Sequence, residues 1–232
     1  MYMLGGMWMA TNSLHLIRFE TQEKLSLEKL IELIFVDGDD EEKFILNEVF
    51  DSIIEGYFIN YYNSKEIIFN SESSSLETII VKKSSVIPFS IDTENNIIDI
   101  WGSKNNVIRI ISKIGILLNH KVTLEYITIN LEKVALNLND ESVKIGKIKI
   151  DNYALEKDII AQCTFDLKNH SNSKEIVKRY SKDLVQLSLT IYKNGEDILT
   201  MIIYRSGSIV IYKSKDEISQ DSLDLIKKIC II

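Results

Sequence analysis

Several kinds of side chain in this sequence could do chemistry, and the acidic run Asp37-Gly38-Asp39-Asp40-Glu41-Glu42 is the densest group. Such a run could hold a divalent cation, but a calcium-binding loop needs glycine at position six and glutamate at position twelve. Counted from Asp37, Glu48 fills position twelve, whereas Glu42 occupies the position that requires glycine. We therefore interpret the run as a solvated acidic loop before a helix, where the helix dipole favours negative charge.

Histidine and cysteine also fail to form a recognisable pattern. His15, His120 and His170 are far apart in sequence, and none has the spacing of metal ligands or of a catalytic triad. We expect His15 to be a partly buried structural residue on a strand and the other two to lie in turns. Cys163 and Cys230 both lie in apolar runs, which favours buried free thiols over a disulfide framework or a zinc site. A triad assembled in space around Cys163 stays open, because only the fold brings such residues together.

A third group consists of Asp151, Asp158 and Asp166, which could serve a metal-dependent nuclease if they lay on adjacent strands. Such a site also needs a Glu-x-Lys element on a strand, and Glu156-Lys157 is the nearest match. Glycine-rich phosphate loops are absent from the sequence. The sequence therefore predicts no catalytic, metal-binding or cofactor-binding residue, and a protein that is not an enzyme.

Composition supports a packed protein and limits its partners. The chain has 232 residues, of which 45% are hydrophobic and 26% charged, and its net charge is −7. This content is ample for a core, while the acidic balance argues against a protein that holds nucleic acid mainly through phosphates. The longest apolar run, 107–118, is interrupted by Arg109, Ser112 and Lys113, so no membrane span is predicted. Two separated cysteines fit a reducing cytoplasm.

The elements that would position these residues read as blocks of strands on short turns, each block followed by a helix. Ser26 precedes a helix to 34, and Ser103 precedes one to 118. We also expect helices over 41–55, 171–180 and 217–229. Strands are expected over 14–19, 57–62, 65–69, 77–82, 86–91, 97–101, 122–129, 145–150, 159–167, 184–192, 199–204 and 209–212. The expected turns include Asn63-Ser64, Ser71 to Ser75, Ser84-Ser85, Asn194-Gly195 and Ser206-Gly207, and the segment 131–138 is ambiguous.

Helices that follow blocks of strands favour an α+β fold, with antiparallel sheets covered on one side by helices. We divide the chain into an N-terminal extension of residues 1–12 and two α+β halves, 13–120 and 121–232. The extension offers four starts, Met1, Met3, Met7 and Met9. A turn, an apolar strand and a Ser-Lys step before an amphipathic helix occur at 95–104 and again at 206–215, so the halves are candidates for a duplication.

The segment 199–215, LTMIIYRSGSIVIYKSK, resembles the repeat unit of the TATA-binding protein fold, with two apolar strands around a Ser-Gly turn and a Ser/Lys lead into a helix. The likeness covers about thirty residues up to 229 and implies a curved antiparallel sheet with helices on its convex side. In that family the concave face binds the minor groove with apolar wedges. The nearest aromatic residues here are Tyr204 and Tyr212, the phenylalanine pairs are absent, and the chain is acidic. The resemblance therefore implies a shape more than a DNA-binding function.

One further aromatic residue, Trp101, shares a strand face with Asp99 and is a candidate interface anchor. The alternative is a sheet face covered by a helix of the same chain. We expect a non-catalytic binding or scaffolding subunit of a cytoplasmic prokaryotic complex, of the kind found in antiphage-defence or mobile-element systems. A protein partner or a homo-oligomer is expected, with no membrane. The alternatives are a nucleic-acid-binding protein with a TATA-binding-protein-like sheet, and a metal-dependent nuclease or hydrolase.

Overall fold

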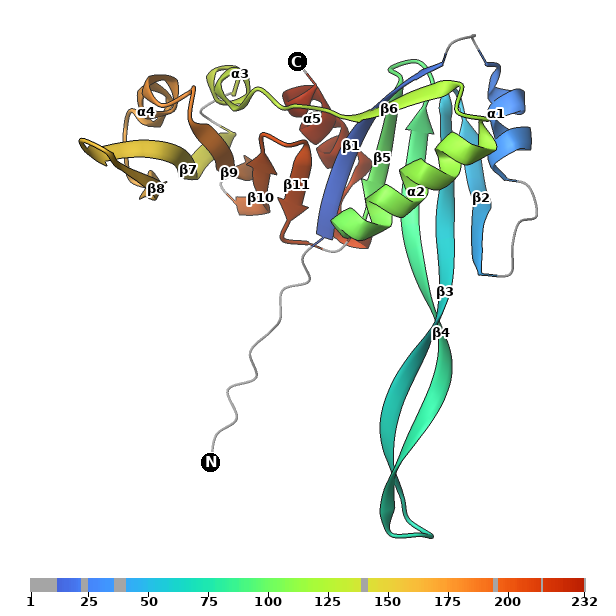
Figure 1. The fold of residues 1–232 in the computed structure, drawn as a ribbon. Coiled ribbons are helices and arrows are strands. Elements are labelled where there is room, and N and C mark those ends of the chain that lie inside the picture. The colour runs from blue at the N-terminus through green and yellow to red at the C-terminus, as the bar shows by residue number, and fades with distance from the viewer. Residues whose placement is uncertain are drawn as a thin grey trace. The chain divides into compact units, whose positions relative to one another are not determined.

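The computed structural model describes residues 12–21, 25–35, 41–138, 142–193, 196–213 and 215–231. Antiparallel strands make up most of these residues, and helices are the smaller part (Figure 1). The expected antiparallel sheet is therefore confirmed, although strands dominate more than the α+β class implies. The chain divides into two compact units, residues 18–125 and residues 1–17 with 126–232. Strand β1 (Asn12–Thr21) contributes residues to both units.

The unit formed by residues 18–125 contains α1 (Leu27–Ile34), β2 (Glu42–Phe50), β3 (Ile53–Asn70), β4 (Ser75–Asp92), β5 (Ile97–Trp101), α2 (Lys104–Leu117) and most of β6 (Val122–Tyr126). Its strands follow the order β2-β3-β4-β5-β1, and β6 also pairs with β1. In Figure 1, α2 lies across one face of these strands and buries Val107, Ile110 and Ile114. The rings of Phe44, Phe58 and Phe89 meet at centroid distances of 5.0–5.3 Å. A sheet with one apolar face needs such a cover to remove that face from water.

Both expected helix starts are confirmed in this unit. The amide of Lys29 donates to Ser26 Oγ at 3.3 Å, and the amide of Asn106 donates to Ser103 Oγ at 3.4 Å. Each serine thereby satisfies one of the amides that the first helical turn leaves without a partner.

The helix expected over 41–55 is wrong, because Glu42–Phe50 forms strand β2 and pairs antiparallel with β3. The pairing shifts register between Leu46 and Glu48. Such a bulge breaks the two-residue period of a strand. Leu46, Val49 and Phe50 consequently stand at spacings that imitate a helix.

The turns expected at Asn63-Ser64 and Ser84-Ser85 are also wrong. Strands β3 and β4 run straight through both positions and pair residue by residue from Ile53↔Asp92 to Asn70↔Ser75. The chain reverses at residues 71–74, as expected, and the amides of Glu72 and Ser73 donate to Asn70 Oδ1 there. Serine and asparagine are common in turns, but here cross-strand pairing keeps them extended.

The second unit contains α3 (Leu131–Leu136), β7 (Val143–Glu156), β8 (Ile159–Asp166), α4 (Ser173–Arg179), β9 (Leu184–Lys193), β10 (Glu196–Tyr204), β11 (Ser208–Ile211), the short 3-10 helix η1 (Lys215–Glu217) and α5 (Gln220–Cys230). Its strands follow the order β1-β11-β10-β9-β7-β8. The ambiguous segment after Asn130 resolves as α3, and the Ser206-Gly207 turn is confirmed. The Asn194-Gly195 turn lies outside the described residues, although β9 and β10 pair directly beside it.

The two strand–helix junctions that suggested a duplication differ in detail. After β5, Ser103 caps α2 at once. After β11, Lys215 instead enters η1, and the cap of α5 is Ser219, whose Oγ accepts from the amide of Ser222 at 3.3 Å. The α-helix therefore begins directly after the Ser-Lys step in the first junction but only at Gln220 in the second, where Ser214 lies outside the described residues.

Candidate interaction surfaces

Among the residues singled out for catalysis or metal binding, Asp151 lies on β7 and Asp166 on β8, which are paired strands, and Asp158 lies in the turn between them. The residue opposite Asp166 is Lys147, and Cys163 lies on β8 opposite Ile150, so the pairing does not bring the three aspartates together.

His15 is buried in β1, where its ring lies edge-on to that of Tyr126 at 6.4 Å, and His120 and His170 are exposed in turns. Among the described residues, no group of three or more His, Cys, Asp or Glu side chains could hold a metal ion. Of the acidic run, residues 37–40 lie outside the described part, and Glu42 pairs with Arg109 at 3.4 Å.

The candidate interface residues fall into two different environments. Trp101 is 6% exposed and Asp99 is 1% exposed, so both side chains are buried. Ser90 Oγ donates to Asp99 Oδ2 at 3.0 Å, which pairs the neighbouring strands β4 and β5 through this polar group. Tyr204 and Tyr212 are half-buried in the other unit. By strand register they share one face, because both stand next to the buried positions Ile203 and Ile211.

A hollow of about 600 Å³ opens on that tyrosine face. Hydroxyl groups and lysines dominate its lining: Lys144, Lys147, Lys168, Ser188, Thr190, Tyr192, Thr200 and Tyr212. The Lys144 ammonium lies 5.2 Å from the centre of the Tyr192 ring. Lys147 Nζ is 4.0 Å from the Asp166 carboxylate. The hollow is thus a polar surface with ammonium groups at its rim.

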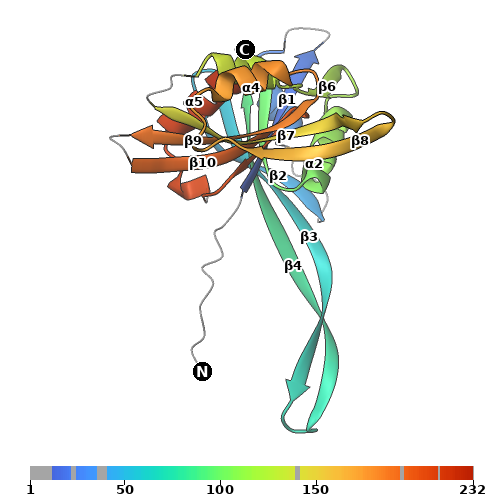
Figure 2. The same cartoon turned by 90° about the vertical axis from the view of Figure 1, so that its left-hand side faces the viewer.

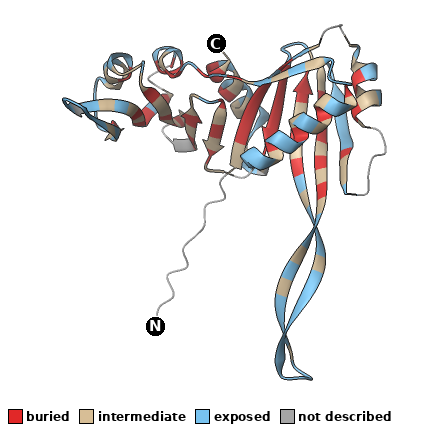
Figure 3. Cartoon of the chain, viewed as in Figure 1, coloured by how far each residue is buried: buried red, intermediate tan, exposed pale blue. Residues whose placement is uncertain are grey.

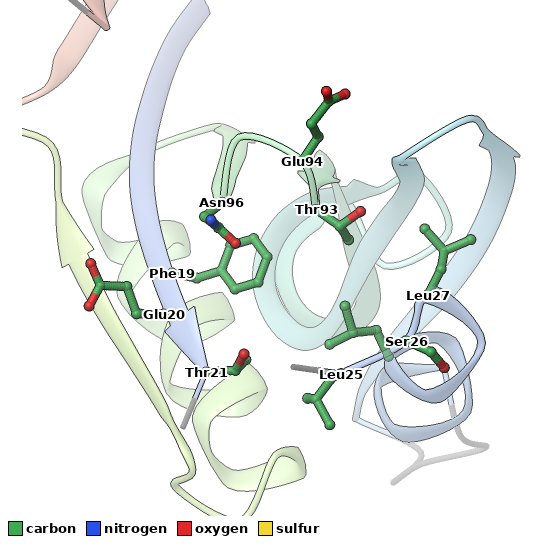
Figure 4. A pocket seen from close by; sticks show the side chains of 10 residues that line it. Phe19, Glu20, Thr21, Leu25, Ser26, Leu27, Thr93, Glu94 and Asn96 are labelled. Carbon is green, nitrogen blue, oxygen red and sulfur yellow. The ribbon is translucent and has the colours of Figure 1, made fainter. Parts of the chain in front are cut away.

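A larger hollow of about 750 Å³ lies in the unit of residues 18–125 (Figure 4). Phe19 and Leu30 are buried in its lining, and Thr93 Oγ1 donates to the carbonyl of Ser52 at 2.8 Å. Figure 4 shows the carboxylate of Glu94 pointing away from the ring of Phe19. The lining therefore combines apolar side chains with hydroxyl, amide and carboxylate groups.

The most exposed apolar surface lies on the hairpin of β3 and β4. Strand β2 pairs with β3 only as far as Asn60, and β5 pairs with β4 only as far as Phe89, within the described chain. Beyond these points the two strands pair with each other alone, and we call residues 61–86 the arm. Figures 1 and 2 show the arm extending past the other strands of its sheet. In Figure 3 it is almost entirely exposed or half-buried.

Large apolar side chains cluster toward the arm's end. Exposed fractions reach 72% for Ile67, 65% for Phe69, 73% for Leu76 and 67% for Ile80. These four share one face, since Ile67 pairs with Thr78, Phe69 with Leu76 and Lys65 with Ile80. A two-stranded ribbon has little core of its own, and clustered apolar groups on a surface mark an interaction site.

Sequence reasoning missed this surface because it divided each long strand in two. A turn at Asn63-Ser64 would have returned the following residues to a compact sheet. The available signal was the pair of runs Ile67-Ile68-Phe69 and Ile79-Ile80-Val81, which place apolar residues on both faces of one hairpin. Only the extended pairing shows that no strand of the described chain flanks them.

The chain matches no protein-family model, and a search of curated proteins finds no significant relative. Among the helices of the described residues, none has the length and apolar character needed to cross a membrane.

Proposed function

We propose that this chain is a non-catalytic binding or scaffolding subunit of a cytoplasmic prokaryotic multi-protein complex, and that the arm is its protein-binding surface. One observation carries the proposal: Ile67, Phe69, Leu76 and Ile80 are each at least 65% exposed on one face of the arm. Burying such side chains contributes about 1.5–3 kcal/mol each. A partner that covers this face would therefore bind with substantial affinity.

The arm also offers backbone groups to a partner. Along residues 61–70 and 75–88, each strand has one edge that no other strand of the described chain pairs. Free edges of this kind add strands from other proteins through main-chain hydrogen bonds. Apolar contact and strand addition together would allow the arm to bind another subunit of a complex.

A shortened arm tests the proposal. Residues 63–82 are replaced by Asn-Gly, which joins Tyr62 to Lys83, a directly paired position. The amide of Tyr61 donates to the carbonyl of Glu41, on the side away from β4. Successive amides of a strand point to opposite sides, so the amide of Tyr62 points toward Lys83. A two-residue type I′ turn requires such a hydrogen-bonded pair beside it. We expect cooperative thermal unfolding at a midpoint close to that of the full chain, and loss of the stoichiometric partner that the tagged full chain recovers from its native host. Equal recovery by both proteins would overturn the proposal.

The matched control is the full-length chain with Ile116→Ser, which removes an apolar side chain that is 58% exposed on α2, away from the arm. Recovery by this variant should equal that of the unmodified chain. Genes encoded beside this one offer an independent check, because subunits of one complex are often encoded together.

A nucleic-acid-binding protein with a TATA-binding-protein-like sheet is the second candidate, and the hollow beside Tyr212 favours it. Lys144, Lys147 and Lys168 stand at the rim of that hollow, where ammonium groups could contact phosphates. Two TATA-binding-protein-like halves belong to the same proposal. Fluorescence anisotropy with labelled duplex DNA tests it: binding should weaken steeply with salt and in Lys144→Glu. Binding that is absent at low salt would exclude this candidate.

A further inference from the structure

We infer that the arm binds a second copy of this chain, with the face that carries Lys65 and Lys82 seated on the β2–β3 face that carries Glu48 and Glu55. The inference rests on the proposed function and names the partner. Both faces consist of residues of the unit 18–125.

The arm face is apolar and cationic. It consists of Tyr61, Asn63, Lys65, Ile67 and Phe69 on β3 and their partners Ser84, Lys82, Ile80, Thr78 and Leu76 on β4. These ten positions contain two lysines and no carboxylate. The Lys82 ammonium lies 5.1 Å from the centre of the Tyr61 ring, which holds that charge on this face. A chain of net charge −7 thus presents a locally positive apolar surface.

The receiving face is apolar and anionic. Glu48 and Glu55 stand directly opposite each other on β2 and β3. Like charges at such positions destabilise a sheet, and neither carboxylate has an ion-pair partner among the described residues. Ile45 and Phe50 lie on the same face, because their partners on β3, Tyr57 and Ile53, are each two residues from Glu55. Their side chains are 37% and 38% exposed.

The two faces cannot satisfy each other within one molecule. Lys65 follows Glu55 by ten residues of one continuous strand. At about 3.3 Å per residue, that is a separation of about 33 Å. A second copy can bring its lysines to these carboxylates, while its exposed Ile67 and Phe69 cover Ile45 and Phe50.

The edge position of β2 gives the arm of a second copy access to this face from the side. In the strand order of its unit β2 is terminal, so the described chain leaves one side of its backbone unpaired. If each copy gives its arm to the other, the assembly closes as a dimer. If the exchange runs one way, it continues to larger rings or filaments.

Charge reversal tests the inference on the purified full-length chain. Sedimentation velocity at up to about 100 μM should show self-association with a Kd in the micromolar range or tighter. Lys65→Glu with Lys82→Glu should weaken association about tenfold or more, and so should Glu48→Lys with Glu55→Lys. Mixing these two double variants should restore a complex, because the reversed charges complement each other again.

The matched control is Lys104→Glu with Lys121→Glu, the same change of charge at exposed positions outside the arm. It should associate like the unmodified chain. A purified chain that stays monomeric throughout, or double variants that associate unchanged, would overturn the inference. The shortened-arm experiment separates this outcome from a failure of the proposed function. If the full-length chain is monomeric but recovers a different protein, and the shortened chain does not recover that protein, the scaffold role stands and only the self-association is wrong.

Discussion

Among the glycines that the structure describes, Gly207 is the one whose identity the backbone dictates most strongly. Its φ is +89°, and a Cβ atom at this position would lie 2.2 Å from the carbonyl oxygen of Ile127. Backbone cannot yield to such a contact as a flexible side chain can. Its amide also donates to Tyr204 at 3.1 Å, and its carbonyl accepts from Leu16 at 3.3 Å. The turn between β10 and β11 therefore fixes the neighbouring strand as well.

We expect Gly207→Ala to lower the free energy of unfolding by about 3 kcal/mol, through the steric conflict and the positive φ together. Gly115→Ala is the matched control, because a Cβ there meets only His120 Nδ1 at 4.0 Å within helix α2. Alanine in a helix should raise stability by about 0.5–1 kcal/mol. Urea unfolding followed by circular dichroism measures both. A Gly207→Ala protein as stable as the unmodified chain would contradict the prediction.

The two cysteines should differ sharply in reactivity. Burial raises the pKa of Cys230 to about 12, whereas Cys163 is half-buried. The thiolate is the reactive form, so at pH 8 iodoacetamide should modify Cys163 first and Cys230 only after unfolding. Mass spectrometry of the peptides checks this, and rapid modification of a Cys163→Ser protein would contradict it.

The same pKa has a consequence for stability. Above the model-peptide value of 9.0, the Cys230 thiol of the unfolded chain ionises while that of the folded chain stays neutral. Its contribution is therefore complete below pH 9 and is lost as the pH rises toward 12. The free energy of unfolding should fall less between about pH 8 and 11 in Cys230→Ala than in the unmodified chain, as urea unfolding at both pH values would show.

At the scale of elements, α2 depends on its cap more than on its composition. Ser103 accepts the amide of Asn106, and the helix then places Val107, Ile110 and Ile114 against the sheet. The helix contains Asn and several β-branched residues, which favour helix only weakly. Capping and tertiary burial therefore hold α2 in place.

Ser103→Ala should lower the free energy of unfolding by about 1 kcal/mol, because the amide of Asn106 loses its acceptor. Ser112→Ala, at an exposed position within the same helix, should leave stability unchanged or raise it slightly. Thermal unfolding of the two variants side by side measures the difference. Equal unfolding midpoints for the two variants would contradict the prediction, because water would then solvate the Asn106 amide as well as Ser103 does.

Elements were predictable where a local signal fixes them. Ser26, Ser103 and the Ser206-Gly207 turn were expected from residue type, and the structure confirms each. Strand β2 was not predicted, because the register shift between Leu46 and Glu48 interrupts the two-residue alternation of apolar and polar side chains. The full length of β3 and β4 was not either, since Asn and Ser at 63–64 and 84–85 imitate turns.

At the scale of the molecule, β1 contributes several residues to each of the two compact units. The amide of Leu16 donates to Gly207 in one unit, and the amide of Phe19 donates to Asn96 in the other, at 3.3 and 3.0 Å. Leu14, Leu16 and Ile17 have no exposed surface. Because one strand makes backbone hydrogen bonds in both units, a change in β1 should lower the stability of both.

Leu16→Pro removes one of these amide donors and should destabilise the chain by about 3 kcal/mol or more. Hydrogen exchange should then show lost protection in both β11 and β5, because β1 is continuous. Arg18→Ala, at an exposed position of the same strand, should leave exchange unchanged. Protection lost in β11 alone would show that the units unfold independently.

The sequence by itself determined the antiparallel class of the sheets, the caps of α1 and α2 and the turn at Gly207. These depend on residue type and near neighbours, such as a hydroxyl beside a free amide or a glycine at positive φ. Only the tertiary structure decided that Trp101 is buried, that Tyr204 and Tyr212 share a face and that residues 61–86 form one exposed arm. Those outcomes depend on pairing between residues distant in sequence. The neighbours of a strand decide whether its apolar side chains are buried in a core or exposed to solvent.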